Sequence, residues 1–252
     1  MGRTRTPLPR LGLAILVLLA TPACVRSEAQ RRSDDLAASR AVTFRSADGV
    51  RLEGRLFGHG SVGVVLSHML PADQTSWWDF ARELADRGYV ALTYDFRGYC
   101  PGGQSGCSQG PKDIAAIWQD VLAAIDEVRS AGVTRVVLIG ASMGGTASLV
   151  AASRPGMDVT AVVTLSAPVS IEGLVASPSV LTNVTAAKLF IAGNGDPTGA
   201  ADAAQQLYDT SPPPKRVDIV TSNDHGTDLL TGNQSGIVRT TILNDLEQYA
   251  AP

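Results

Sequence analysis

Apolar runs and amphipathic stretches alternate along most of the chain. Short runs rich in valine, isoleucine and leucine predict buried strands, and stretches with apolar residues three or four positions apart predict helices. The predicted strands are 41–58 (two strands joined by a turn at 47–49), 62–68, 89–96, 135–142, 159–168, 187–196 and 215–226. The predicted helices are 75–88, 113–132, 143–153, 199–210 and 236–250.

This alternation predicts an α/β fold with a mostly parallel central sheet and helices on both faces. A single domain over residues 41–252 accommodates all of these elements. The connection between "LSAP" (165–168) and "AKLF" (187–190) is too short for a large helical cap, which predicts an open, shallow site. In such sheets, ligands bind at the carboxyl ends of the strands.

The N-terminus differs from the rest of the chain. Three arginines precede an apolar run over 11–20, and small residues follow it. This order is typical of an export signal, which we predict over residues 1–23. Residues 24–40 are polar and have no apolar period long enough for a core element, so we predict a flexible tether there.

The segment "LATPAC" (19–24) resembles a lipobox, the signal after which the cysteine of a bacterial lipoprotein is lipidated. Thr21 stands where that pattern prefers leucine, and Pro22 is also a departure from it. The resemblance implies lipidation of Cys24 and a cell-envelope lipoprotein. The alternative is ordinary secretion, with Cys24 removed or left free. We therefore predict the membrane as a partner only if Cys24 carries a lipid anchor.

The other two cysteines, Cys100 and Cys107, lie in a glycine-rich loop. Outside the cytoplasm they could close a small disulfide loop, so the cysteine pattern agrees with export. The net charge of −3 and the lack of a basic patch with interleaved aromatic residues give no reason to expect a nucleic-acid partner.

The stretch "VVLIGASMGG" (136–145) carries the strongest chemical signal. Its Gly140-Ala-Ser142-Met-Gly144 matches the G-x-S-x-G nucleophile elbow, between a predicted strand and a predicted helix. A turn this tight strains the serine backbone, and glycines two residues away on each side remove steric collisions. Ser142 Oγ is then exposed above the sheet, at the amino end of a helix that favours negative charge. The sequence therefore predicts Ser142 as a nucleophile.

A serine nucleophile needs a base and an acid that orients the base. The chain has three histidines, and only His225 follows Ser142, at the end of a predicted strand in "NDHGTD". Asp196 lies between the two at another strand end, directly after "KLFIAGNG". We therefore predict a triad of Ser142, Asp196 and His225.

Residues 41–252 resemble the α/β-hydrolases, in particular dienelactone-hydrolase-like and monoglyceride-lipase-like serine esterases. The segment "HMLP" (68–71) stands where those proteins have H-G-x-P, and "YDFRGY" (94–99) is similar to D-x-R-G-x-G. The resemblance implies an oxyanion hole formed by the backbone N–H groups of Met143 and Leu70, and a structural role for His68. Two residues depart from the family pattern: Met69 and Cys100 each replace a glycine.

These features together predict a serine hydrolase that cleaves carboxylic esters through an acyl-enzyme, with no metal or organic cofactor. The alternatives are a peptidase or thioesterase with the same triad, and a catalytically idle cell-envelope binding protein of the same fold. Trp77 and Trp78 follow residues 68–71, which we call the oxyanion loop. They either line an acyl pocket or are buried in the core beneath a helix.

Overall fold

The computed structural model describes residues 1–2, 27–99 and 107–252, and within them eight strands form one sheet. The strand order is β1-β2-β4-β3-β5-β6-β9-β10. β1 and β2 pair antiparallel, as do β2 and β4, and every other pairing is parallel. The strands are β1 (Ser39–Arg45), β2 (Arg51–Phe57), β3 (Val62–Ser67), β4 (Val90–Tyr94), β5 (Arg135–Ala141), β6 (Ala161–Leu165), β9 (Ala187–Gly193) and β10 (Lys215–Val220).

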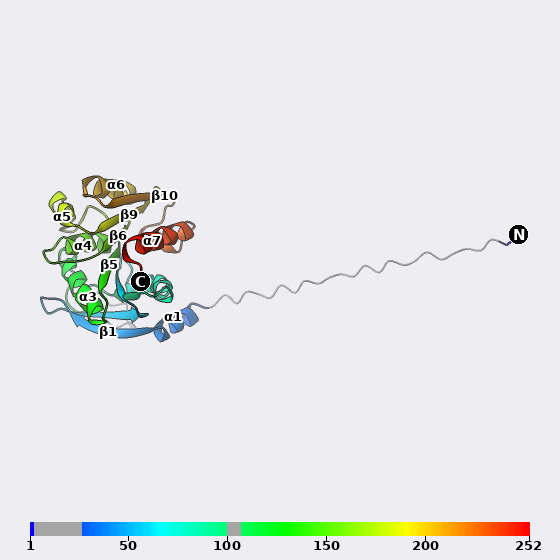
Figure 1. The fold of residues 1–252 in the computed structure, drawn as a ribbon, viewed down its shortest axis with the longest axis horizontal. Helices are drawn as coiled ribbons and strands as arrows, with labels where there is room; N and C mark the ends of the chain where they lie inside the picture. The colour runs from blue at the N-terminus through cyan, green and yellow to red at the C-terminus, as the bar shows by residue number, and fades with distance from the viewer. Residues whose placement is uncertain (3–26, 100–106) are drawn as a thin grey trace.

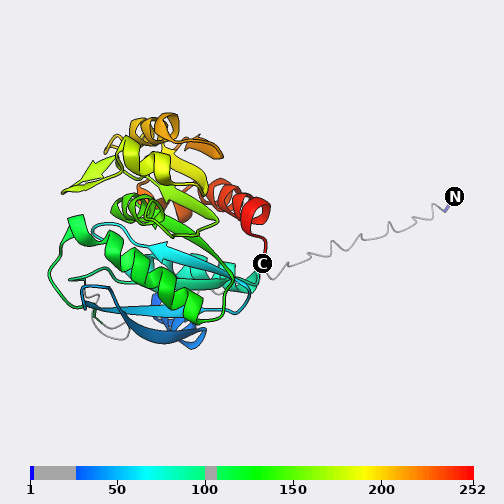
Figure 2. The ribbon, with the colours of Figure 1, turned by 60° about the vertical axis from the view of Figure 1, so that its left-hand side comes forward.

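Helices cover both faces of this sheet (Figures 1 and 2). The helices α2 (Trp78–Asp86) and α7 (Ser235–Ala250) pack their apolar side chains against one face. The other face is covered by α3 (Trp118–Ser130), α4 (Met143–Ala152) and α6 (Ala200–Thr210). The central strands are therefore buried on both sides, which explains why their sequences are continuous apolar runs. The predicted α/β fold with a mostly parallel sheet is confirmed.

Shorter elements connect these layers. Three are 3-10 helices: η1 (Gln74–Trp77), η3 (Ile114–Ala116) and η4 (Gly226–Leu230). The connection after β6 holds a hairpin of β7 (Ser170–Ile171) and β8 (Leu174–Val175), followed by the short helix α5 (Pro178–Asn183). No large cap covers the sheet in this connection, as the sequence predicted.

The two tryptophans belong to the core. Trp77 is fully buried and Trp78 is 2% exposed, and they pack with Phe57 and Phe80 beneath α2. Of the two alternatives for these residues, the core position is the one observed.

Residues 28–37 form a helix, α1 (Glu28–Ala37), where the sequence predicted a flexible tether. The Ser27 side chain caps it by accepting a hydrogen bond from the Gln30 backbone N–H. Asp35 is buried and forms an ion pair with Arg82 of α2, with 2.6 Å between Oδ1 and Nε. Polar contacts of this kind leave no apolar period in the sequence.

The predicted domain boundary is therefore wrong for residues 28–40. The folded unit includes α1, and β1 begins at Ser39 rather than near residue 41. Most of the predicted signal over 1–23 lies outside the described residues, and so do Cys24 and Cys100. Export, lipidation and the Cys100–Cys107 disulfide therefore stay predictions. Within the described part of the chain, no helix has the length and apolar content that a bilayer crossing requires.

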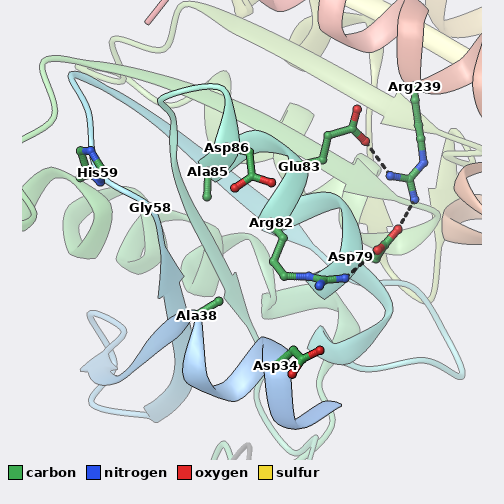
Figure 3. A pocket seen from close by; sticks show the side chains of 10 residues that line it. All are labelled: Asp34, Ala38, Gly58, His59, Asp79, Arg82, Glu83, Ala85, Asp86 and Arg239. Atoms are coloured by element: carbon green, nitrogen blue, oxygen red, sulfur yellow. Dashed lines mark hydrogen bonds and ion pairs between the residues drawn. The ribbon is translucent and has the colours of Figure 1, made fainter. Parts of the chain in front are cut away.

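Charged side chains join α2 to α7 on the outer surface (Figure 3). The Arg239 guanidinium binds Glu83 at 2.6 Å and Asp79 at 2.7 Å. Arg82 binds Asp79 at 2.8 Å. These pairs are partly exposed to solvent, so each contributes little to stability.

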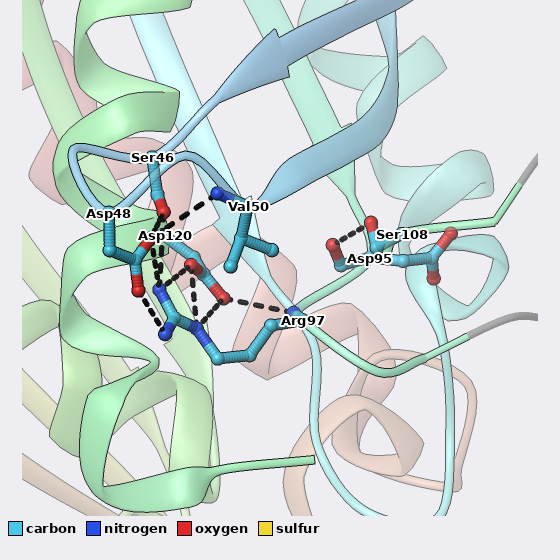
Figure 4. Close-up of polar contacts among 7 residues, drawn as sticks. All are labelled: Ser46, Asp48, Val50, Asp95, Arg97, Ser108 and Asp120. Atoms are coloured by element: carbon cyan, nitrogen blue, oxygen red, sulfur yellow. Dashed lines mark hydrogen bonds and ion pairs between the residues drawn. The ribbon is translucent and has the colours of Figure 1, made fainter. Parts of the chain in front are cut away.

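A buried arginine joins three segments near the end of β4 (Figure 4). Arg97 Nη2 lies 2.7 Å from Asp120 Oδ1 of α3, and Arg97 Nη1 lies 2.7 Å from Asp48 Oδ2 in the β1–β2 turn. The Arg97 backbone N–H donates to Asp120 Oδ2 at 2.9 Å. Burial opposes the charge on Arg97, but the hydrogen bonds to Asp120 and Asp48 outweigh it and raise the pKa of Arg97. The guanidinium therefore stays charged and holds the three segments together.

Replacing Asp120 with alanine should strongly destabilise the fold. The Asp120→Ala variant leaves the buried guanidinium without its main partner, which we expect to lower the free energy of unfolding by about 3 kcal/mol or more. Asp126→Ala on the same helix is the matched control, because Asp126 is 78% exposed and 4.0 Å from its partner Arg129. Its effect should stay within about 0.5 kcal/mol in urea denaturation. Equal losses in the two variants would contradict this account.

Candidate active site

Ser142 occupies the turn between β5 and α4. Its backbone has φ 50° and ψ −120°, a conformation that residues other than glycine rarely adopt. The Ser142 backbone N–H donates to Leu165 O at 2.8 Å, which fastens the turn to the neighbouring strand β6. The strand–turn–helix context predicted from the sequence is confirmed.

Close backbone packing explains the glycines on either side of Ser142. A Cβ atom on Gly140 would overlap the Gly144 carbonyl group. A Cβ atom on Gly144 would overlap the Ser67 carbonyl oxygen and lie 2.6 Å from His68 O. The start of α4 is therefore in contact with the end of β3, and only glycine fits between them.

Asp196 and His225 meet at the ends of the adjacent strands β9 and β10. His225 Nδ1 lies 2.7 Å from Asp196 Oδ2. The other carboxylate oxygen, Oδ1, accepts hydrogen bonds from the Thr198 backbone N–H at 3.0 Å and from Thr198 Oγ1 at 2.8 Å. Burial would raise the pKa of Asp196, but the hydrogen bonds from Thr198 and His225 outweigh it and lower that pKa. Asp196 is therefore a stable carboxylate that can orient the imidazole.

The serine and the histidine lie beside one cavity of about 190 Å³. Ser142 and His225 both line it, and Ser142 is 7% exposed. Its other walls include Pro168, Ile171 and Ala203. Among the described residues, no hydrogen bond joins Ser142 Oγ to His225. Catalytic hydrogen bonds in general are often long without substrate and shorten only in the complex.

A larger hollow of about 800 Å³ lies between α1, α2 and α7 (Figure 3). The side chains that line it include Arg82, Arg239, Asp79 and Glu83, which pair with one another. None of Ser142, Asp196 and His225 lines this hollow. Ser142 and His225 therefore line the smaller cavity and not the larger one.

The backbone amides of Met143 and Leu70 meet one requirement of an oxyanion hole. Met143 is the first residue of α4, where a helix provides no acceptor for the backbone N–H. Within the described chain, neither the Met143 nor the Leu70 N–H donates to another backbone group. Neither residue is among those that line the cavity, so the oxyanion hole stays a prediction.

Met69, which replaces a family glycine, packs against the residue that follows His225. A Cβ atom on Gly226 would overlap Met69 Sδ, and Gly226 has φ 55°. Met69 is 6% exposed. The larger side chain in the oxyanion loop is therefore matched by a glycine in the loop that carries the histidine.

His68 is structural, as the resemblance implied. The side chain is fully buried, with Nδ1 2.9 Å from Met69 O and Nε2 accepting a hydrogen bond from the Phe96 backbone N–H at 3.1 Å. Burial lowers the pKa of His68 to about 4, so the ring is neutral at pH 7. His68 therefore joins residues 68–71 to the segment directly after β4. His59 is exposed.

Comparison with known proteins assigns the fold to a family. Residues 56–241 match the model of the alpha/beta hydrolase family, and the chain belongs to that family. The esterase Pf2001 of Pyrococcus furiosus is similar in structure, with a TM-score of 0.73 and 16% identity over 86% of this chain and 93% of that one. A search of curated protein sequences finds no match.

Two further solved structures share the fold. An esterase from Exiguobacterium antarcticum has a TM-score of 0.64 and 16% identity, covering 82% of this chain and 99% of that one. The enol-lactonase from Burkholderia xenovorans LB400 has a TM-score of 0.66 and 17% identity, covering 81% of this chain and 99% of that one. At such identities these likenesses show the fold alone.

Two features of the site were not predicted from the sequence. One is Thr198, which donates two hydrogen bonds to the Asp196 carboxylate. A hydroxyl residue two positions after an aspartate is a common local hydrogen-bonding pattern, and this spacing could have indicated it. Ile171 lines the cavity from the hairpin β7–β8, whose two-residue strands carry no apolar period.

The contact between Gly144 and β3 predicts a clear difference between two alanine substitutions. Gly144→Ala should lower the free energy of unfolding by roughly 3 kcal/mol or prevent folding, because the new methyl group meets backbone atoms that cannot move aside. Gly236→Ala is the matched control. Gly236 is also the second residue of a helix, and a Cβ atom there has no neighbour within 4 Å.

The control variant should gain about 0.5–1 kcal/mol, because alanine favours the helix more than glycine does. Thermal and urea unfolding of both variants measure the difference. A Gly144→Ala protein as stable as the Gly236→Ala protein would show that the packing at the turn is looser than described.

Proposed function

We propose that this protein is a serine hydrolase that cleaves carboxylic esters through an acyl-enzyme. The single observation that carries the proposal is the 2.7 Å contact between His225 Nδ1 and Asp196 Oδ2 beside a cavity that Ser142 also lines. The strained backbone of Ser142 at the start of α4 supports the same role for this residue. The names of the structural neighbours, two esterases and an enol-lactonase, agree with ester chemistry.

The base in this mechanism is His225. When Nδ1–H donates to the Asp196 carboxylate, the lone pair of Nε2 is left free to accept a proton. Ser142 Oγ attacks the ester carbonyl carbon while its proton passes to Nε2. Asp196 stays ionised and stabilises the imidazolium that forms.

The remaining steps return the enzyme to its starting state. The N–H groups of Met143 and Leu70 are the proposed donors to the oxyanion of the tetrahedral intermediate. The imidazolium of His225 gives its proton to the alkoxide, and the alcohol leaves. A water molecule then attacks the acyl-enzyme with His225 as base, which releases the acid and regenerates Ser142.

Ser142→Ala should abolish both covalent labelling and turnover. A fluorophosphonate probe should label the wild-type protein on Ser142, and p-nitrophenyl butyrate hydrolysis should fall at least about 1000-fold in the variant. Ser153→Ala is the control at the other end of α4, because Ser153 Oγ only caps the helix by donating to Val150 O. A wild-type protein that the probe leaves unlabelled would instead favour the idle binding protein.

Asp196→Asn should lower kcat about 1000-fold or more with little change in KM. An asparagine amide facing Nδ1 favours the tautomer in which Nε2 carries the proton, so His225 can no longer act as base. Asp202→Asn on α6 is the control, because Asp202 is exposed and lies outside the cavity. Steady-state kinetics with p-nitrophenyl butyrate measure the effect, and a similar loss in both variants would remove Asp196 from the mechanism.

A panel with matched amide and thioester substrates tests the preference for esters.

A further inference from the structure

The cavity beside Ser142 also restricts the substrate. We propose that it binds one short apolar arm of the ester, of about six carbon atoms at most, and that Ile171 and Ala203 set this length. The inference rests on the proposed ester hydrolysis and adds the class of substrate to it.

The volume sets the length of the arm. The cavity measures about 190 Å³. An apolar protein cavity of about 150 Å³ holds one benzene molecule, which has six carbon atoms. The reacting carbonyl group needs part of the space at Ser142, so a butyl-sized to hexyl-sized group fills the remainder.

Apolar residues form much of the cavity wall, and the hydroxyl residues Ser166, Ser170 and Thr198 also line it. Pro168 and Ile171 come from the connection after β6, and Ala200 and Ala203 come from the first turns of α6. Ser142 and His225 lie at the reacting end. An alkyl chain buried between these walls gains about 0.8 kcal/mol per CH₂ until the cavity is full, after which each further carbon meets the wall.

The hairpin that carries Ile171 is fixed in place. Leu174, which pairs with Ile171, is 2% exposed and is buried in the core. The Ala176 backbone N–H donates to Val169 O at 2.9 Å and closes the hairpin, and Thr146 Oγ1 donates to Pro168 O at 2.6 Å. The backbone that carries Ile171 therefore cannot move away without breaking these contacts.

Ala203 also lines the cavity and can be enlarged. It is half-buried, so a larger side chain extends into the cavity rather than into the core, whereas its neighbour Ala204 is buried against the sheet. Ala201 lies on the same helix, is also half-buried and does not line the cavity. Ala201→Leu is therefore the matched control for Ala203→Leu.

Two substrate series test the inference and identify the arm. p-Nitrophenyl esters from acetate to decanoate vary the acyl arm, and acetate esters from methyl to octyl alcohol vary the alcohol arm. In one of the two series, kcat/KM of the wild-type enzyme should fall at least 10-fold beyond about six carbons. Ala203→Leu should lower kcat/KM at least 10-fold for the four-carbon member of that series and less than 3-fold for its shortest member. Ala201→Leu should leave both values within 2-fold.

Ile171→Ala provides an independent change in the opposite direction. It should raise the ratio of kcat/KM for the eight-carbon member to that for the four-carbon member at least 5-fold in the same series. This variant keeps the inference testable if Ala203→Leu does not fold, which thermal unfolding would reveal.

The outcomes separate this inference from the proposed function. Normal fluorophosphonate labelling and turnover, together with profiles that stay flat or rise with chain length in both series, would overturn the short-arm inference alone. So would length profiles that neither Ala203→Leu nor Ile171→Ala shifts. A protein without labelling or turnover would remove the proposed function and this inference with it.

Discussion

The contact between the start of α4 and the end of β3 is the constraint on which the site depends. Gly144 lies against the carbonyl groups of Ser67 and His68, at a distance that no side chain tolerates. This contact holds the start of α4 against the end of β3, directly after Ser142 with its φ of 50°. The strain in the serine backbone is balanced by packing on both sides, because the parallel sheet and its two helix layers are rigid.

The electrostatics of the site follow from the order of the strands. β9 and β10 are parallel neighbours, so their carboxyl ends carry Asp196 and His225 to one edge at hydrogen-bonding distance. A buried carboxylate is stable only when its oxygens have partners, and here Thr198 satisfies Oδ1 while His225 satisfies Oδ2. The Thr198 bonds hold the carboxylate in one orientation beside Nδ1 of His225, where an ionised carboxylate can only accept a hydrogen bond.

Features that depend on strand order and strand ends could be predicted from the sequence. The parallel sheet, the elbow at Ser142 and the positions of Asp196 and His225 all leave a local pattern, because apolar runs mark strands and strand ends mark the site. The helix α1 left no such pattern, since an ion pair of Asp35 with Arg82 and a cap at Ser27 hold it rather than an apolar stripe. The hairpin with Ile171 is built from strands of two residues, too short for any period to appear.

Met69 shows how a departure from the family pattern is compensated at a distance in the sequence. The thioether occupies space that a side chain at 226 would need, and residue 226 is a glycine. The oxyanion loop and the histidine loop are therefore in van der Waals contact, and a change in either one alters the packing of the other. Since the hairpin that holds Ile171 is also tied to α4 through Thr146, the loops around the cavity form one connected rim. A connected rim of this kind supports the proposed selection of substrates by shape, because movement of one loop would disturb the packing of its neighbour.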